Sequence, residues 1–465
     1  MNFMGIDIGT TSVKTAVFDE RLAQKISLNA DYTLDAHGDI VEFDGEAYWD
    51  IVKGEVEKVK KTLSVDALAI DTQCETLILT DENGTPVRPA IVWLDNRATE
   101  EAELITAHFG HKRVYEVTGQ PEITATWPAC KLLWVKRNEP EVWAKVKKVF
   151  LLEDWILYKM TGKFISEKTL QSSTIYFDIH KAAWWDEMLA FIGVEKDMLP
   201  TLYSSATQVG EYDGMKVVTG AIDQIAGAIG AGVVKKGIVS EMTGTTMVIF
   251  MPSDTVPVYD ETSIVPCHYN YDDKYCLLSW TPTAGMSLKW FKNALCESFS
   301  FAELDALAES VPAGSDGVTF LPYLCGSTMP KYNPAARGSF TGLTTEHHRG
   351  HFVRAVMEAV SCMLKSNLDY LGLEVDEIRA MGGGANSPLW CQMKADMTGK
   401  RLVTLKNKET ACLGSAILAG VGVGAFPSVE KAAEMIELGR AYTSEGTDYT
   451  ECYERYLKYD KLLNI

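Results

Sequence analysis

The first eighteen positions contain residues whose types and spacing suit phosphate and metal binding. Asp7 lies near the end of a strand-like run, Phe3–Ile8, and shortly before a turn made of Gly9, Thr10, Thr11 and Ser12. The backbone N–H groups and hydroxyls of such a turn can hydrogen-bond to phosphate oxygens. A neighbouring carboxylate can hold Mg²⁺ through water, and Lys14 could add a positive charge. A plain hairpin with a capping aspartate accounts for the same residues, so both interpretations stay open here.

A second carboxylate, Asp223, stands between a predicted strand over Lys216–Ala221 and a predicted helix of small residues over Gln224–Gly230. At that place it could act as a general base that takes the proton from a substrate hydroxyl during phosphoryl transfer. The ordinary alternative is that Asp223 caps the helix. The spacing alone does not separate these two roles.

Three consecutive glycines, Gly382, Gly383 and Gly384, follow the predicted strand Glu377–Met381. Ser387 and Pro388 then form an N-cap and first-turn pair for a helix that should end at Gly399. Glycines after a strand allow a ligand to approach the backbone, and a helix N-terminus favours the anionic part of that ligand. The segment therefore predicts a nucleotide contact, with a structural turn as the alternative.

A polar and aromatic set follows two strand-like segments, Ala67–Ile70 and Leu77–Thr80. Its members are Gln73, Glu75, Trp93, Asp95 and Arg97. Carboxylates and amides can bind hydroxyls while an indole covers a carbon face, which is a mixture that suits a polyhydroxylated ligand. Surface ion pairs would explain Asp95 and Arg97 equally well.

The elements that would position these residues occur twice. The runs Phe3–Ile8 and Val13–Phe18 flank the first turn, and Ile238–Met242 and Met247–Met251 flank a second one at Gly244 and Thr245. Strands alternate with helices elsewhere, for example in the helical patterns near 49–63 and 351–371, which predicts an α/β architecture. A glycine-rich stretch near 233–237 predicts a boundary between a domain at 1–235 and a domain at 236–465.

Composition narrows the class of protein. The chain has 465 residues and a formal net charge of −19, which argues against nucleic acid as a partner. No apolar run reaches the roughly 18–20 residues that span a bilayer, and the N-terminus lacks the features of a secretory signal. The ten cysteines form no CxxC pair. We therefore expect a cytoplasmic enzyme without a membrane or nucleic-acid partner.

With these segments in order, the chain resembles the FGGY family of carbohydrate kinases over roughly residues 3–445. The motifs that carry the resemblance are GIDIGTTSVK, WPACKLLW, GAIDQIAGAIGAG, GSFTGLTTEHHRGHFVRAVME, GGGANSPLWCQ and ETACLGSAILAG. Trp127 departs from the family's usual residue at its position. The resemblance implies an α/β fold of two duplicated ribonuclease H-like (actin-like ATPase) domains with an interdomain cleft.

The resemblance also implies roles for individual residues, with ATP and Mg²⁺ as cofactors. Asp223 would be the catalytic base, and Asp7 and Asp223 would be associated with the metal. ATP would be bound by Gly9, Thr10, Thr11, Lys14, Gly244, Thr245, Gly383 and Asn386. The sugar would be bound in the first domain by Gln73, Glu75, Trp93, Asp223 and Gln224. The expected partner is a small sugar or polyol, and a homodimeric assembly is left open.

The identity of the sugar or polyol that accepts the phosphoryl group depends on a different set of residues. Glycerol kinases carry Gln-Arg-Glu where this chain has Gln73-Cys74-Glu75, and xylulokinases carry Met-His nearby, which this chain lacks. Glu167-Lys168-Thr169 stands where xylulokinases commonly have Asp-Tyr-Ser. The segments PYLCGSTMPKYNPAARGSF and TAGMSLKWF are nearer to xylulokinases. We therefore expect a ketose such as xylulose, with glycerol or another polyol as the alternative. A non-catalytic sugar sensor or an actin-like ATPase is the alternative of another class.

Overall fold

The computed structural model describes residues 1–261, 265–329, 333–372 and 374–463, and it divides into two compact units. The first unit contains residues 1–234, 253–277 and 409–436, and the second contains 235–252, 278–408 and 437–465. Each unit is therefore assembled from separated stretches of the chain. Residues 330–332 of the segment PYLCGSTMPKYNPAARGSF lie outside the described residues.

The main sheet of the first unit has its most buried strands in the middle. β1 runs parallel to β6 and antiparallel to β2, and β6 runs parallel to β15. Every residue of β6 is buried, as expected for a strand covered on both faces. In order, the strands are β14 (Gln208–Tyr212), β15 (Met215–Ile222), β6 (Ala67–Thr72), β1 (Asn2–Ile8), β2 (Ser12–Asp19) and β3 (Gln24–Asp31).

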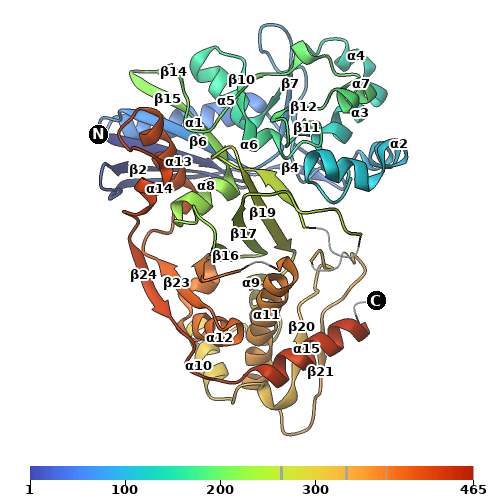
Figure 1. Ribbon diagram of the computed structural model, residues 1–465, viewed down its shortest axis with the longest axis vertical. Helices are drawn as coiled ribbons and strands as arrows, with labels where there is room; N and C mark the ends of the chain where they lie inside the picture. Colours follow the sequence, from blue (N-terminus) through green and yellow to red (C-terminus); the bar gives the residue numbers. More distant parts are fainter. Residues whose placement is uncertain (262–264, 330–332, 373, 464–465) are drawn as a thin grey trace. The chain divides into compact units, whose positions relative to one another are not determined.

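Two helices of small residues pack against this sheet and against each other. They are α8 (Asp223–Gly230) and α13 (Thr410–Gly422), and Figure 1 shows the late helix α13 beside the early strands. A Cβ atom added at Gly5 would lie 1.9 Å from the Cys412 carbonyl oxygen, and one at Gly414 would lie 1.8 Å from the Ala226 carbonyl oxygen. Glycine is thus required at both contacts, which bring α13 close to the strand and helix ends that carry the predicted site.

A second sheet of the first unit contains β4 (Asp35–His37), β5 (Ile40–Phe43), β8 (Ala90–Ile91), β7 (Leu77–Thr80) and β9 (Lys148–Leu151). Shorter pairings join β10 (Ile165–Glu167) to β13 (Thr201–Tyr203), β11 (Phe177–Asp178) to β12 (Ala183–Trp184), and β18 (Cys267–Tyr269) to β19 (Tyr275–Thr281). The other helices are α1 (Gly45–Lys60), α2 (Thr99–Thr118), α3 (Pro128–Asn138), α4 (Pro140–Trp143), α5 (Leu152–Thr161), α6 (Lys168–Gln171), α7 (Asp186–Ile192) and α14 (Val429–Ala433).

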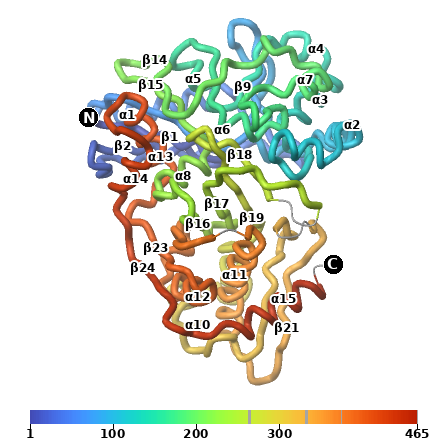
Figure 2. The backbone as a smooth tube through the Cα atoms, viewed as in Figure 1, coloured from blue at the N-terminus to red at the C-terminus, as the bar shows by residue number. Residues whose placement is uncertain are grey.

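The second unit repeats the central arrangement of the first. β16 is antiparallel to β17 and parallel to β22, just as β1 is antiparallel to β2 and parallel to β6. The strand order is β17 (Met247–Ser253), β16 (Ile238–Thr243), β22 (Glu377–Met381), β23 (Arg401–Leu405) and β24 (Leu438–Tyr442), with β20 (Thr319–Leu321) paired to β21 (Ser339–Thr341). Figure 2 shows the long helix α11 (Arg349–Leu371) beside α12 (Pro388–Thr398). The other helices of this unit are α9 (Gly285–Leu295), α10 (Phe301–Glu309) and α15 (Thr450–Leu463).

The predicted strands and helices that carry motifs form within one or two residues of their predicted ends. Helical patterns predominate in the sequence from Glu100 to about Leu199, but in the structure this stretch also contains the strands β9, β10, β11 and β12. These strands have two to four residues each, which is too short for an alternating pattern to show.

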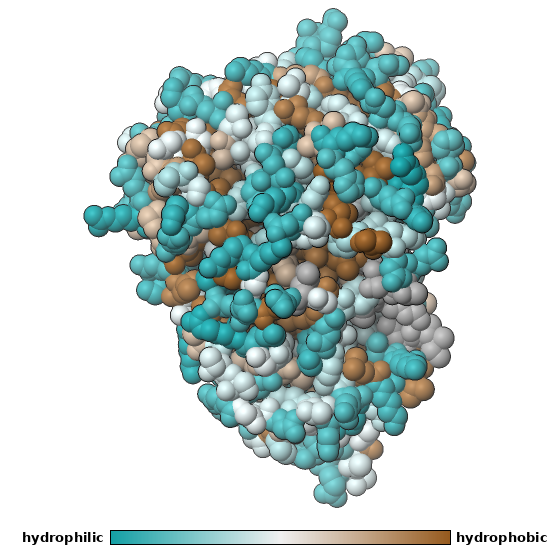
Figure 3. All heavy atoms as spheres, viewed as in Figure 1, coloured by the Kyte–Doolittle hydropathy of each residue, from teal (hydrophilic) through white to brown (hydrophobic). Residues whose placement is uncertain are grey.

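Hydrophilic side chains predominate on the face drawn in Figure 3, with smaller apolar areas between them. Such a surface agrees with the high net charge of the chain. Within the part of the chain that the structure describes, no helix is both long enough and apolar enough to cross a membrane.

Candidate active site

Three neighbouring strands of the first unit end in carboxylates. Asp7 on β1 lies opposite Asp71 on β6, and Asp71 lies opposite Ala221 on β15, two residues before Asp223. Because the carboxyl ends of parallel strands meet at one edge of a sheet, the three side chains gather there. Two of them, Asp7 and Asp223, are predicted site residues. Asp71 was missed, although an aspartate inside an otherwise apolar strand was a signal that could have found it.

Burial shifts the ionisation of all three carboxyls. It raises the pKa of Asp7 to about 6, against the nearby charge of Lys14, and it raises the pKa of Asp223 to about 7, with the charge of Asp7 adding to the rise. Burial and then the Asp7 charge raise the pKa of Asp71 well above its usual value. Negative charge on these carboxyls is therefore disfavoured in the absence of a counter-charge, and a bound cation would stabilise their ionised forms.

Ser415 on helix α13, late in the chain, holds the Asp71 side chain by a hydrogen bond. The Ser415 hydroxyl donates to Asp71 Oδ2 at 2.6 Å, whereas Asp71 Oδ1 is buried and has no hydrogen-bond partner among the described residues. The contact joins positions 344 residues apart in the chain. It depends on the close glycine packing of α13 described above, which local sequence patterns do not reveal.

The predicted phosphate turn forms the tip of the β1–β2 hairpin. Gly9 N donates to the Ser12 carbonyl at 3.0 Å, and the Tyr32 hydroxyl donates to the Gly9 carbonyl. The ammonium group of Lys14 pairs with Glu409 at 3.4 Å. Thr11 at the tip of the turn is exposed, as contact with a ligand requires.

Trp93 joins the predicted sugar set to this turn. Its indole Nε1 donates to Thr10 Oγ1 at 3.1 Å. The hydroxyl of Thr10 accepts this bond and therefore keeps its own hydrogen for another acceptor. The structure thus links one residue predicted for the sugar with one predicted for phosphate.

We expect Trp93→Phe to raise the KM for ATP by about 2–10-fold with a smaller change in kcat, because one neutral hydrogen bond that orients Thr10 is lost. Initial-rate kinetics at saturating acceptor measure this. Trp127→Phe is the matched control, since the Trp127 indole donates to the Glu122 carbonyl at 2.7 Å. Equal KM values for the two variants would contradict the link.

The other predicted sugar residues lie beside Asp223. Gln73 Nε2 donates to the Tyr48 hydroxyl at 3.1 Å, and Gln224 N donates to Asp223 Oδ1 at 2.8 Å. Between them, Cys74 Sγ lies 3.3 Å from Gln224 Oε1 and 3.6 Å from Asp223 Oδ1. Burial raises the pKa of the Cys74 thiol well above its usual value, so this group remains a protonated donor beside Asp223.

The partly buried Glu75 and the fully buried Lys131 interact electrostatically near these residues. Glu75 has a positive φ of 117°, and burial raises its pKa to about 8, against the charge of Lys131. Burial lowers the pKa of Lys131 to about 8. The Lys131 ammonium donates to the carbonyls of Val92 at 2.9 Å and Trp93 at 3.2 Å, so it holds the backbone that carries the indole. Lys131 belongs to the WPACKLLW motif, but it was not predicted as a site residue.

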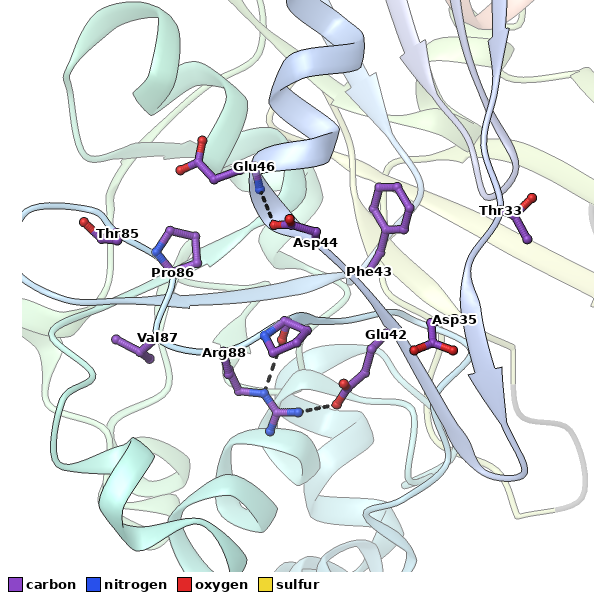
Figure 4. Close-up of a pocket in the computed structure, with 11 residues that line it drawn as sticks. Thr33, Asp35, Glu42, Phe43, Asp44, Glu46, Thr85, Pro86, Val87 and Arg88 are labelled. Atoms are coloured by element: carbon purple, nitrogen blue, oxygen red, sulfur yellow. Dashed lines mark hydrogen bonds and ion pairs between the residues drawn. The ribbon is translucent and has the colours of Figure 1, made fainter.

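Asp95 and Arg97 belong to an ion-pair network and not to the set around Asp223. Arg97 pairs with Asp95 at 2.7 Å and with Glu42 at 2.6 Å, and Arg88 also pairs with Glu42. Figure 4 shows Arg88 reaching Glu42 at a pocket of about 660 Å³ between β5 and the segment 85–89. Asp95 is fully buried, so the ion-pair interpretation holds, although not at the surface. None of the predicted site residues lines this pocket.

In the second unit, the glycine segment lies against the second hairpin. A Cβ atom at Gly382 would lie 2.7 Å from the Thr243 carbonyl oxygen, and one at Gly384 would lie 2.7 Å from the Thr243 side chain. Gly244 N donates to the Thr246 carbonyl at 3.0 Å, two residues on, whereas Gly9 N in the first hairpin donates to the Ser12 carbonyl, three residues on.

The predicted nucleotide residues of this unit are exposed or partly exposed at that junction. Thr245, Gly383 and Asn386 are exposed and Gly244 is partly buried. Asn386 Oδ1 accepts a hydrogen bond from the ammonium of Lys408 at 2.7 Å. Ser387 caps α12 by accepting from Trp390 N at 3.1 Å, as predicted. The structure thus packs the segment that contains Gly383 and Asn386 against the hairpin that contains Gly244 and Thr245, through the contacts of Gly382 and Gly384 with Thr243.

Comparison with known proteins identifies the class. Models of the FGGY family of carbohydrate kinases match residues 2–233 with its N-terminal domain and 241–423 with its C-terminal domain. The chain is 30% identical over 473 residues to a xylulose kinase of Escherichia coli (strain K12), covering 96% of this chain and 95% of that protein. It is 29% identical over 464 residues to a gluconokinase of Bacillus subtilis (strain 168), covering 93% and 90% of the two chains.

A solved structure of a xylulose kinase from Lactobacillus acidophilus has the same fold. It matches with a TM-score of 0.93 at 24% identity, covering 99% of this chain and 98% of that chain. The protein therefore has the two-domain α/β fold that was predicted. The chain belongs to the FGGY family of carbohydrate kinases.

Proposed function

We propose that this carbohydrate kinase transfers the terminal phosphoryl group of ATP to a hydroxyl of a ketose such as xylulose. The observation that carries the proposal is the position of Asp223, partly buried at the carboxyl end of β15 beside Cys74, Gln224 and the Asp7–Asp71 pair. We also propose that residues 1–235 hold the sugar and that residues 236–465 hold adenosine through Gly383 and Asn386.

In this proposal Asp223 accepts the proton of the acceptor hydroxyl while the phosphoryl group arrives. Its raised pKa, about 7, suits proton transfer near neutral pH, where a base must be both ionised and basic enough. Gln73, Gln224 and Glu75 bind the hydroxyls of the sugar, and Trp93 covers its carbon chain. Cys74 helps to keep Asp223 and Gln224 in place, because its single thiol hydrogen lies within reach of an oxygen of each.

The residues present also fit a nucleotide with its divalent cation. Gly9, Thr10, Thr11, Gly244 and Thr245 offer turns with backbone and hydroxyl donors, and Lys14 adds a positive charge. Asp7, the unpaired Asp71 Oδ1 and Asp223 offer oxygen ligands of the kind that Mg²⁺ prefers. When bound, Mg²⁺ offsets the charge of the phosphates and of these carboxylates.

Two features favour a neutral ketose over glycerol and over gluconate. Cys74 replaces the arginine of the glycerol-kinase pattern, which removes a strong donor for a small triol and leaves room for a longer chain. The set around Asp223 is rich in carboxylates, whereas its nearby ammonium, Lys131, already donates to two carbonyls. An anionic acceptor such as gluconate would therefore meet repulsion.

The test is a panel of acceptors assayed with MgATP and purified protein: D-xylulose, other ketoses, glycerol and gluconate. We expect the best ketose to exceed glycerol and gluconate in kcat/KM by roughly 5–150-fold, which corresponds to about 1–3 kcal/mol for a lost donor or an unfavourable charge. A higher kcat/KM for glycerol would favour a polyol kinase. A higher value for gluconate would overturn the electrostatic argument.

A further inference from the structure

The strand that delivers Asp223 is irregular just before it ends. β15 pairs with β6 in register up to Val218, and again from Ala221, with one extra residue in between. A Cβ atom at Gly220 would lie 1.7 Å from the Ile70 carbonyl oxygen, so glycine is required in this bulge. The bulge sets the direction in which the strand end, and hence Asp223, leaves the sheet.

On the side opposite β6, β15 pairs with β14, and this pairing ends at Val218, where the bulge begins. Thr219 still bonds to the backbone of Thr207. Beyond Thr219, buried side chains replace the missing strand. Glu153 Oε1 accepts from Gly220 N at 3.1 Å, and Thr169 Oγ1 accepts from Ile222 N at 3.1 Å.

Thr169 is itself held by a buried carboxylate. Its hydroxyl donates to Glu167 Oε1 at 2.6 Å, and its backbone N–H donates to Glu167 Oε2 at 2.6 Å. A backbone N–H only donates, so Thr169 Oγ1 accepts from Ile222, and the Thr169 hydroxyl hydrogen is available to Glu167. A chain of hydrogen bonds therefore runs from Ile222 N–H through the Thr169 hydroxyl to Glu167. All three residues are buried, so water cannot replace a lost member.

Ile222 is the residue directly before Asp223 and the N-cap of α8, and its side chain makes no capping bond. We infer that Thr169, oriented by Glu167, is a positioning residue that fixes the backbone at Ile222 and thereby aims the Asp223 carboxylate at the acceptor hydroxyl. The inference rests on the proposed role of Asp223 as the base. It assigns a role to Glu167-Lys168-Thr169, the segment that departs from the xylulokinase pattern.

The test replaces Thr169 with valine, which keeps the shape and removes the hydroxyl. With MgATP and the best acceptor of the panel, Thr169→Val should lower kcat by about 10–100-fold and leave both KM values within about threefold, because the base is misplaced while the binding residues stay. Thr169→Ser should restore kcat to within about threefold. Thr80→Val, at a buried threonine whose hydroxyl donates to the Asp81 carbonyl at 3.1 Å, is the matched control and should keep its activity.

A double-mutant cycle separates positioning from a general structural effect. If Thr169 acts through Asp223, adding Thr169→Val to Asp223→Asn should cause no further loss of kcat. A full additional loss in that background, or a Thr169→Val kcat equal to that of Thr80→Val, would overturn the inference. Should Thr169→Val fail to fold, Glu167→Gln takes its place in the cycle, with the same expected loss and the same overturning results. If Asp223→Asn itself is active, the proposed function fails instead, so the two failures are distinguishable.

Discussion

Asp223→Asn should lower kcat by about 10²–10⁴-fold while the KM for ATP changes little, because the amide cannot accept the proton of the acceptor hydroxyl. Asparagine has nearly the same size and can still accept a hydrogen bond from Gln224 N, which in the wild type donates to Asp223 Oδ1 at 2.8 Å. The fold should therefore persist. Steady-state kinetics with the best acceptor, together with a thermal unfolding curve, measure the two effects separately.

The control is another buried aspartate of the same unit. Asp178 is 4% exposed and accepts backbone hydrogen bonds from His180 and Lys181, outside the predicted site. Asp178→Asn should keep kcat within about threefold, since the substitution reaches no reacting group. Near-normal turnover in Asp223→Asn would show that this residue is not the base, whatever the control does.

Lys394→Met should destabilise the second unit by about 3–5 kcal/mol, because it leaves the carboxylate of Glu241 buried without its cation. The Lys394 ammonium donates to Glu241 Oε2 at 2.8 Å and to Thr243 Oγ1 at 2.6 Å. Both ionic side chains are almost wholly removed from solvent, at 1% and 0% exposure. Thr243 directly precedes Gly244, so this pair supports the hairpin proposed to meet the nucleotide. Urea unfolding followed by circular dichroism measures the loss.

Two further variants test whether the loss of stability comes from the buried, unpaired charge. Lys394→Met combined with Glu241→Gln should recover much of the stability, because no buried charge is then left alone. Lys406→Met breaks an ion pair of the same unit in which Lys406 is 63% and Glu437 is 74% exposed, so it should cost less than about 1 kcal/mol. Equal losses for Lys394→Met and Lys406→Met, or a double variant less stable than Lys394→Met alone, would be incompatible with a buried ion pair.

Local sequence patterns were sufficient to predict the strands and helices that carry the motifs. The hairpins around Gly9 and Gly244 form as predicted, and α12 begins at Pro388 and ends before Gly399. These features depend on neighbours in the chain: β-rich runs, turn glycines, a serine cap and a proline at the first helical turn. The family resemblance added the activity class, because its motifs are specific and lie in order along the chain.

The residues that surround Asp223 were decided by tertiary structure. Asp71 meets Ser415, Lys131 meets the carbonyl of Val92, and Thr169 meets the backbone of Ile222. Each partner lies 39 to 344 residues away along the chain. No periodicity or spacing rule connects such positions, since they become neighbours only when parallel strands align and glycine contacts let α13 approach the sheet. The local sequence thus determines which types of reacting groups are present. Their pKa values and orientations depend on burial and on partner residues that only the folded chain brings together.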